Sequence, residues 1–127
     1  MGKSPRELLN GFNKGFKEFS KEMPKEAKSF MSLINTTYEP SYLDLKTKEL
    51  ISVSIGLFSR CEYCIAVHVH NALSAGATRE EILEAAMVAV AFGGGPSMAY
   101  GVTTVKDCLD EFEKDFHKKG NTEEEVG

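Results

Sequence analysis

Two cysteines and a histidine lie close together near the middle of the chain, in the segment Cys61-Glu-Tyr-Cys64-Ile-Ala-Val-His68. On a helix, two thiols at this spacing can close a disulfide without unfolding the chain, and an imidazole one turn further on shares the face of the second thiol. These residue types in this pattern indicate dithiol redox chemistry, in which the thiols cycle between reduced and disulfide forms. Metal binding and inert packing use the same residues, so both remain open on spacing alone.

A redox cysteine reacts as the thiolate, and the sequence offers two ways to produce one. Cys61 is expected at the start of a helix, where unpaired backbone N–H groups favour an anion. Cys64 lies one turn before His68, so the imidazole can take its proton. Cys61 is two turns from His68, roughly 10 Å along the helix axis. The spacing therefore assigns proton removal by His68 to Cys64.

Glu49 is the candidate partner for the imidazole. It has apolar neighbours such as Leu50 and Val53, and a buried carboxylate in such a stretch is costly unless it is paired. A carboxylate bound to one ring nitrogen fixes the imidazole tautomer and helps to pass a proton on. The alternative is a surface glutamate on the same side of the helix as Lys46 and Lys48.

Zinc binding is the main alternative function for the same side chains. A structural zinc site takes four ligands, and Cys61, Cys64 and His68 supply three. The sequence has no second Cys-x-x-Cys or His-x-x-x-His pair, so Cys108 or His70 would have to complete the set through the fold. We expect Cys108 to be a small buried hydrophobic residue and His70 to be partly exposed, off the face of the dithiol.

Helical signals run along nearly the whole chain and must position these residues. Ser4 to Glu7 and Thr78 to Glu81 form capping boxes, and prolines or glycines separate the apolar periodic segments. No strand-like alternation lasts for more than a few residues. The pattern predicts about six helices, at residues 5–23, 24–38, 43–58, 61–76, 79–92 and 97–117.

The length of 127 residues suits one ordinary domain. We expect a single all-α domain over residues 1–119 and a flexible acidic tail over residues 120–127. The helix that includes residues 85–92 is apolar on every side, and a partner subunit is the simplest way to cover it. The sequence thus predicts a homo-oligomer.

Charge and hydropathy exclude several classes of function. The net charge of −4 comes with mixed acidic and basic residues and no basic stripe, which argues against nucleic-acid binding. No apolar run reaches the roughly 18 residues of a membrane span, and the first residues lack the apolar core of a secretory signal. Three cysteines do not resemble the disulfide framework of a small secreted domain. We expect a cytoplasmic protein that binds neither membranes nor nucleic acid.

Taken together, Glu49, Cys61, Cys64 and His68 resemble the active-site pattern of the alkyl hydroperoxidase D-like proteins, in the carboxymuconolactone decarboxylase superfamily. The resemblance covers about residues 43–105, including the Ala-Gly-Ala-Thr-Arg-Glu-Glu-Ile turn at residues 75–82. It implies a helical bundle that assembles as a homotrimer or homohexamer. It also implies peroxidase or peroxiredoxin-type activity in which Glu49 and His68 activate Cys64, which attacks a hydroperoxide, and Cys61 resolves the product to a disulfide.

The resemblance extends to partners and leaves two alternatives. A hydroperoxide or a partner's disulfide is the expected substrate, the thiols carry the electrons without a bound cofactor, and a lipoyl-bearing or peroxiredoxin-type protein can restore the dithiol. Some relatives carry histidine directly before the second cysteine, where this chain has Tyr63, and a phenol cannot act as a base at neutral pH. The alternatives are a zinc-holding helical assembly module and an enzyme of the decarboxylase type, a branch that lacks the paired cysteines.

Overall fold

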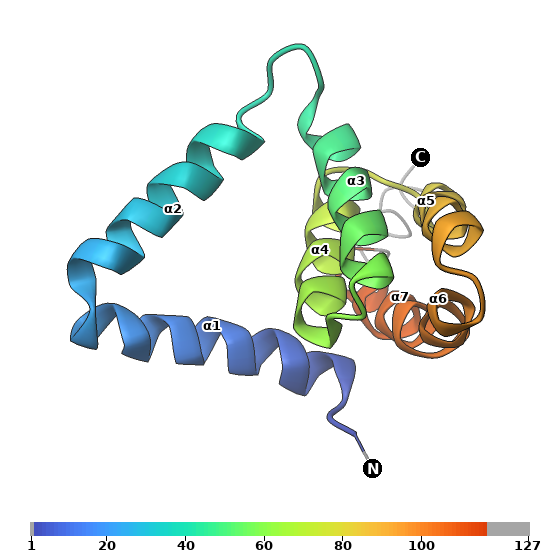
Figure 1. The fold of residues 1–127 in the computed structure, drawn as a ribbon, viewed down its shortest axis with the longest axis horizontal. Coiled ribbons are helices and arrows are strands. Elements are labelled where there is room, and N and C mark those ends of the chain that lie inside the picture. Colours follow the sequence, from blue (N-terminus) through green and yellow to red (C-terminus); the bar gives the residue numbers. More distant parts are fainter. Residues whose placement is uncertain (1, 117–127) are drawn as a thin grey trace, which may run out of the picture.

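The computed structural model describes residues 2–116, and within this range the chain is all-helical and forms one domain (Figure 1). The predicted fold class is thereby confirmed, while the predicted tail at residues 120–127 lies outside the described residues. The helices are α1 (Pro5–Glu22), α2 (Pro24–Tyr38), α3 (Leu45–Phe58), α4 (Glu62–Ser74), α5 (Arg79–Gly93), α6 (Gly95–Tyr100), the π-helical segment η1 (Gly101–Val105) and α7 (Lys106–Phe112).

Short-range capping explains where the helices begin. Both predicted capping boxes are present, with Ser4 opening α1 and Thr78 opening α5. Helix α3 begins two residues later than predicted because the Asp44 carboxylate caps it, accepting a hydrogen bond from the Thr47 N–H at 2.8 Å.

No helix among residues 2–116 is both long enough and apolar enough to cross a membrane.

The C-terminal helical segment differs from the single helix predicted over residues 97–117. It starts at Gly95, after Gly94 has turned the chain with φ of 66°, and Pro96 lies in its first turn. From Gly101 to Val105 the hydrogen bonding is π-helical, and α7 ends at Phe112. A π-helical turn is a local departure from α-helical hydrogen bonding, which the prediction of one continuous helix did not include.

The core lies between α3, α4, α5 and the C-terminal segment. Its largest fully buried side chains come from all four of these parts: Leu57, Ile65, Ile82, Leu109 and Phe112. Helix α1 joins this core only near its start, through Leu8 and Leu9, and the Arg6 guanidinium binds Glu111 on α7 at 3.0 Å.

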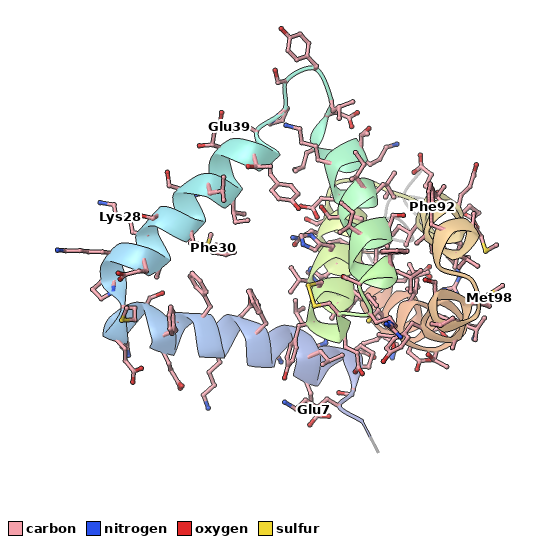
Figure 2. The ribbon with its side chains drawn as sticks, in the orientation of Figure 1. Glu7, Lys28, Phe30, Glu39, Phe92 and Met98 are labelled. Atoms are coloured by element: carbon pink, nitrogen blue, oxygen red, sulfur yellow. A yellow bond between two sulfur atoms is a disulfide. The ribbon has the colours of Figure 1, made fainter. Side chains whose placement is uncertain are left out.

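The rest of α1 and the whole of α2 form an arm that extends away from the α3–α4 pair (Figure 1). Phe12 and Phe19 of α1 are 40% and 47% exposed. The Phe16 ring meets the Phe30 ring at a centroid distance of 6.0 Å, and Phe30 lies on the inner side of the arm (Figure 2). The arm therefore presents an apolar inner surface toward α4, where the candidate site lies.

Candidate dithiol site

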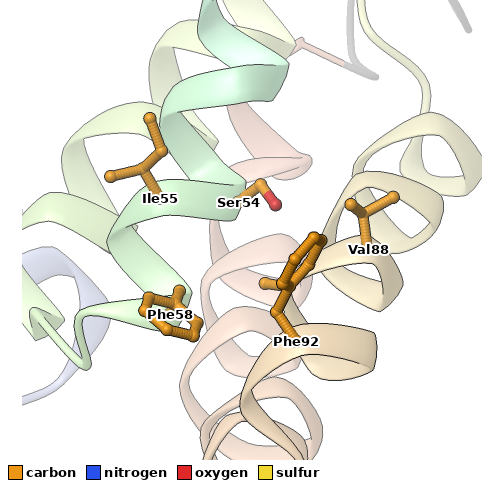
Figure 3. Close-up of a pocket in the computed structure, with 6 residues that line it drawn as sticks. Ser54, Ile55, Phe58, Val88 and Phe92 are labelled. Carbon is orange, nitrogen blue, oxygen red and sulfur yellow. The ribbon is translucent and has the colours of Figure 1, made fainter.

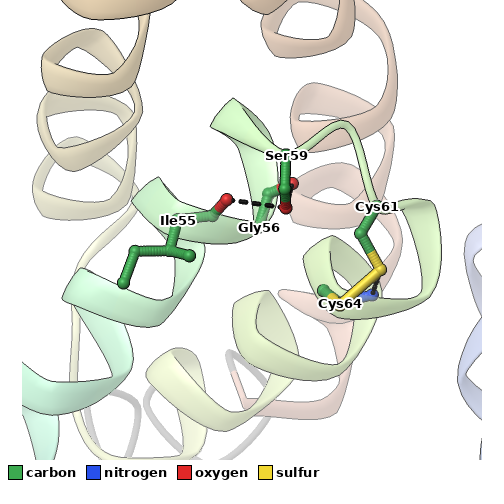
Figure 4. Close-up of a disulfide and its surroundings, with 5 residues drawn as sticks. All are labelled: Ile55, Gly56, Ser59, Cys61 and Cys64. Atoms are coloured by element: carbon green, nitrogen blue, oxygen red, sulfur yellow. Dashed lines mark hydrogen bonds between the residues drawn. A yellow bond between two sulfur atoms is a disulfide. The ribbon is translucent and has the colours of Figure 1, made fainter.

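The cysteine pair sits at the start of α4, directly after a tight turn from α3 (Figure 4). Arg60 adopts a left-handed φ of 56°, and the N–H groups of Arg60 and Cys61 donate to the carbonyls of Leu57 and Gly56, each at 3.0 Å. This is the hydrogen-bond pattern of a Schellman helix end. The turn makes Cys61 the N-cap of α4, and its Sγ accepts a hydrogen bond from the Cys64 N–H at 3.2 Å.

Cys61 and Cys64 are joined by a disulfide, and their Cα atoms are 5.2 Å apart. That separation is ordinary for a disulfide, so α4 needs no distortion to hold it. Beneath the bridge, α3 approaches α4 at Gly56: a Cβ atom placed there would lie 3.1 Å from the Cys64 Cβ. The absence of a side chain at Gly56 is therefore what lets α3 seat closely behind the dithiol.

Glu49 and His68 are hydrogen-bonded to each other, as the sequence predicted. The Oε1 atom of Glu49 lies 2.7 Å from Nδ1 of His68, and Glu49 is only 5% exposed. The carboxylate accepts the Nδ1 proton, which leaves Nε2 of the neutral ring as the nitrogen able to take a proton. The alternative of a surface glutamate is wrong, because Glu49 is buried. Its lysine neighbours bind elsewhere: Lys46 to Glu81 at 2.9 Å, and Lys48 to carbonyls at the end of α2.

A cavity of about 860 Å³ brings the four predicted site residues together between the arm and the α3–α4 pair. The dithiol and the Glu49–His68 pair form part of its wall. Most of the remaining wall is apolar. That wall includes Phe12 of α1, Phe30, Met31 and Ile34 of α2, and Val67 of α4.

Tyr38, at the end of α2, is a residue of this cavity to which the sequence assigned no role. Its ring stacks against the His68 imidazole, with centroids 5.8 Å apart and planes 14° apart. Its hydroxyl forms a short hydrogen bond with Ser52 Oγ on α3. No spacing rule could find Tyr38, because it reaches His68 from a different helix and only the fold brings the two together.

The remaining candidates lie away from the dithiol. Cys108 is fully buried in α7, as predicted, and burial raises the pKa of its thiol to about 12. His70 points to the C-terminal segment, where its Nε2 lies 3.1 Å from Asp115. Within residues 2–116, no group of three or more His, Cys, Asp or Glu side chains is arranged to hold a metal ion.

Comparisons of the sequence and of the fold with known proteins indicate the same family. The model of the carboxymuconolactone decarboxylase family matches residues 24–107. The chain is 36% identical over 85 residues to "uncharacterized protein 4 in cox locus" of Paracoccus denitrificans, an alignment that covers 67% of this chain and 76% of the relative.

Two crystal structures are similar along most of their length. A carboxymuconolactone decarboxylase family protein of Legionella pneumophila, in its apo form, matches with a TM-score of 0.78 and 34% identity, over 87% of this chain and 95% of its own. One from Thermotoga maritima, for which a role in the antioxidative response has been suggested, matches with a TM-score of 0.60 and 32% identity, over 80% and 94%. From the extent of the family match and these similarities, the chain belongs to the carboxymuconolactone decarboxylase family.

Proposed function

We propose that the protein is a thiol-dependent oxidoreductase that reduces hydroperoxides, or a partner's disulfide, with the dithiol of Cys61 and Cys64. The observation that carries this proposal is the buried Glu49 carboxylate bound to His68 Nδ1 at 2.7 Å, in the cavity that the Cys61–Cys64 disulfide also lines. A carboxylate that supports an imidazole beside a cysteine is the usual device for producing a reactive thiolate. The suggested antioxidative role of the Thermotoga protein points in the same direction.

The reaction runs in two steps from the reduced form. His68 takes the proton of the Cys64 thiol, and the thiolate attacks the outer oxygen of a hydroperoxide, which breaks the O–O bond. The leaving alkoxide takes a proton and departs as an alcohol, while Cys64 becomes a sulfenic acid. The Cys61 thiol then attacks the Cys64 sulfur, releasing water and forming the disulfide.

Regeneration uses an external dithiol as reductant. Its thiolate attacks the Cys64 sulfur, so that Cys61 leaves as a thiolate, and the reductant's second thiol then releases Cys64 as its own disulfide forms. The Cys64 N–H that donates to Cys61 Sγ at 3.2 Å would stabilise this leaving thiolate. A lipoyl-bearing or peroxiredoxin-type protein fits this role, and a reducing compartment such as the cytoplasm would supply it.

Tyr63 lines the same cavity as the dithiol and bears on the choice of substrate. Its hydroxyl accepts a hydrogen bond from Lys3 Nζ at 2.7 Å, which leaves the phenol proton free to be donated to another group. We propose that this phenol protonates the leaving alkoxide, although it cannot act as a base. Disulfide exchange needs neither function, so we propose it as an activity independent of Tyr63.

We also propose that the protein is a homo-oligomer, a trimer or hexamer, as the family resemblance implies. An apolar face on α3 and α5 supports this (Figure 3). Around a groove of about 290 Å³, Ile55, Phe58, Val88 and Phe92 are between 53% and 83% exposed. Large exposed apolar side chains gathered in one place are typical of protein interfaces.

The proposed function is tested by anaerobic titration of the fully reduced protein with tert-butyl hydroperoxide. We expect the loss of two thiols and the formation of one tert-butanol for each peroxide consumed, with Cys108 still reduced. A Cys108→Ser variant should behave identically, which serves as the control. Thiols that survive excess peroxide and excess oxidised lipoamide would refute the proposal.

The same preparation separates the two alternative functions. Near-stoichiometric zinc in protein purified without chelator would favour the helical zinc module. A decarboxylase-type activity that survives replacement of both Cys61 and Cys64 by serine would favour the decarboxylase branch.

A further inference from the structure

The Tyr38 ring lies beside the His68 imidazole in an offset stack inside the cavity, with planes 14° apart. We propose that Tyr38 is a positioning residue, which holds the His68 ring so that Nε2 can take the proton from Cys64. This rests on the proposed function, in which His68 is the base.

The hydrogen bond to Glu49 is not enough to orient the imidazole. It fixes the place of Nδ1, at 2.7 Å from the carboxylate, but the ring can still rock about that point. The His68 side chain is 23% exposed and faces the cavity, so tight packing does not stop this motion on the cavity side. A flat ring lying nearly parallel to the imidazole removes this freedom, and offset stacking at this centroid distance is favourable in itself.

The orientation of Tyr38 is set by α3, the helix that also carries Glu49. Ser52 Oγ uses its single proton to donate to the Lys48 carbonyl at 2.9 Å, so in its bond with Tyr38 the phenol must be the donor. Lys48 Nζ donates to the carbonyls of Thr37 and Glu39, at 2.8 and 2.5 Å. These bonds fasten the end of α2 to α3 beside His68.

This fastening matters because α2 otherwise belongs to the arm. Helix α2 meets α1 at the corner where the two helices join, and its C-terminal end, near Glu39, is hydrogen-bonded to α3 (Figures 1 and 2). Tyr38, which stacks on the imidazole, is the last residue of α2 and therefore lies where the arm is fastened to α3. The position of the arm and the orientation of the base are thus linked through Tyr38.

Other ionisable groups face the same cavity and must stay constant in a test. They are Glu49 from α3, Cys61, Tyr63 and Cys64 from the start of α4, and Glu39 beyond α2. Replacing Tyr38 by phenylalanine or leucine changes none of them. Tyr38→Phe keeps the flat ring and removes the bond to Ser52, whereas Tyr38→Leu removes both.

The test compares these two variants with the wild type in the full-length reduced protein. The ¹⁵N shifts of the His68 ring at pH 8 report which nitrogen carries the proton, and the rate of thiol loss with tert-butyl hydroperoxide reports the chemistry. Tyr38→Phe loses the bond to Ser52, but the Lys48 bonds still hold the end of α2 beside His68. We therefore expect the wild type and Tyr38→Phe to hold the proton on Nδ1 and to react at similar rates. In Tyr38→Leu the two ¹⁵N shifts should move toward each other, and the reaction should slow by about tenfold or more.

Two results would overturn the proposal: an unchanged His68 spectrum and rate in Tyr38→Leu, or a Tyr38→Phe variant as impaired as Tyr38→Leu. Thermal unfolding checks that the variants are folded, and Tyr38→Met makes the same comparison if Tyr38→Leu does not fold. The ¹⁵N measurement needs no peroxide. An inert wild type with the expected ¹⁵N shifts would therefore refute the proposed function and leave the positioning role standing.

Discussion

Replacing Glu49 by glutamine tests whether the buried carboxylate supports the imidazole during proton transfer. Glutamine has nearly the same shape and its side-chain oxygen can still accept the Nδ1 proton. The substitution therefore removes the negative charge 2.7 Å from the ring and little else. Because Glu49 is only 5% exposed, water screens this charge poorly and cannot replace it.

The size of the effect follows from the bond that is weakened. A hydrogen bond to a charged partner contributes about 1.5–3 kcal/mol, against about 1 kcal/mol for a neutral one. In the proposed mechanism His68 becomes positively charged as Cys64 loses its proton, so the difference of about 0.5–2 kcal/mol appears in that step. Since about 1.4 kcal/mol corresponds to a factor of ten, we expect Glu49→Gln to react about 2- to 30-fold more slowly.

The measurement is the stopped-flow rate of thiol loss after the reduced protein is mixed with tert-butyl hydroperoxide at neutral pH. Glu39→Gln is the matched control, because it removes the same charge from the wall of the same cavity. We expect the control to react like the wild type. Equal rates for Glu49→Gln and Glu39→Gln would refute the role given to the carboxylate.

Three further predictions concern packing, burial and assembly. Gly56→Ala should destabilise the oxidised protein by about 1 kcal/mol in a denaturant titration, since overpacking against Cys64, 3.1 Å away, outweighs the gain in helix propensity; an equal or higher stability would contradict the close approach. Cys108 should resist iodoacetamide at pH 8 until the protein unfolds. Its raised pKa also means that stability falls as the pH rises from 9 toward 12, because the unfolded thiol ionises first; rapid labelling of the native protein would show that Cys108 is accessible. Phe92→Asp should reduce the mass measured by light scattering, whereas Val102→Asp, 57% exposed but outside the groove, should not; an unchanged mass for Phe92→Asp would place the interface elsewhere.

The helices that the sequence predicted best are those with strong local signals. Ser4 and Thr78 open their helices as expected, because a capping box is decided by residues within one turn of each other. Asp44 was missed as the cap of α3, since it lacks the glutamate three residues on that completes a capping box. The π-helical segment at Gly101 was missed because the sequence was interpreted there as one continuous α-helix.

The site could be predicted where its residues share a helix and less well where they do not. The phase of α4 was enough to group Cys61, Cys64 and His68. The pairing of Glu49 with His68 was predicted from the cost of burying an unpaired carboxylate. Whether Glu49 is buried at all is decided by the packing of α3 on α4, which the sequence does not give. Tyr38 needed the fold itself, because its place over His68 depends on how the arm is fastened to α3.

The mechanism depends on Cys64 being the attacking cysteine and Cys61 the resolving one. One feature of the structure favours the reverse assignment. His68 lies one turn beyond Cys64, whereas the N–H groups at the start of α4 favour a thiolate on Cys61. We give the attacking role to Cys64 because a base can remove its proton outright, while a single N–H donor only stabilises the anion.

The most direct test of this claim traps the sulfenic acid. Reduced Cys61→Ser and Cys64→Ser proteins, each also carrying Cys108→Ser, are treated with one equivalent of tert-butyl hydroperoxide and then with dimedone, and the adduct is measured by mass spectrometry. We predict a dimedone adduct on Cys64 in the Cys61→Ser protein and none in the Cys64→Ser protein. An adduct on Cys61 of the Cys64→Ser protein, with an inert Cys61→Ser protein, would contradict the account and make Cys61 the attacking cysteine.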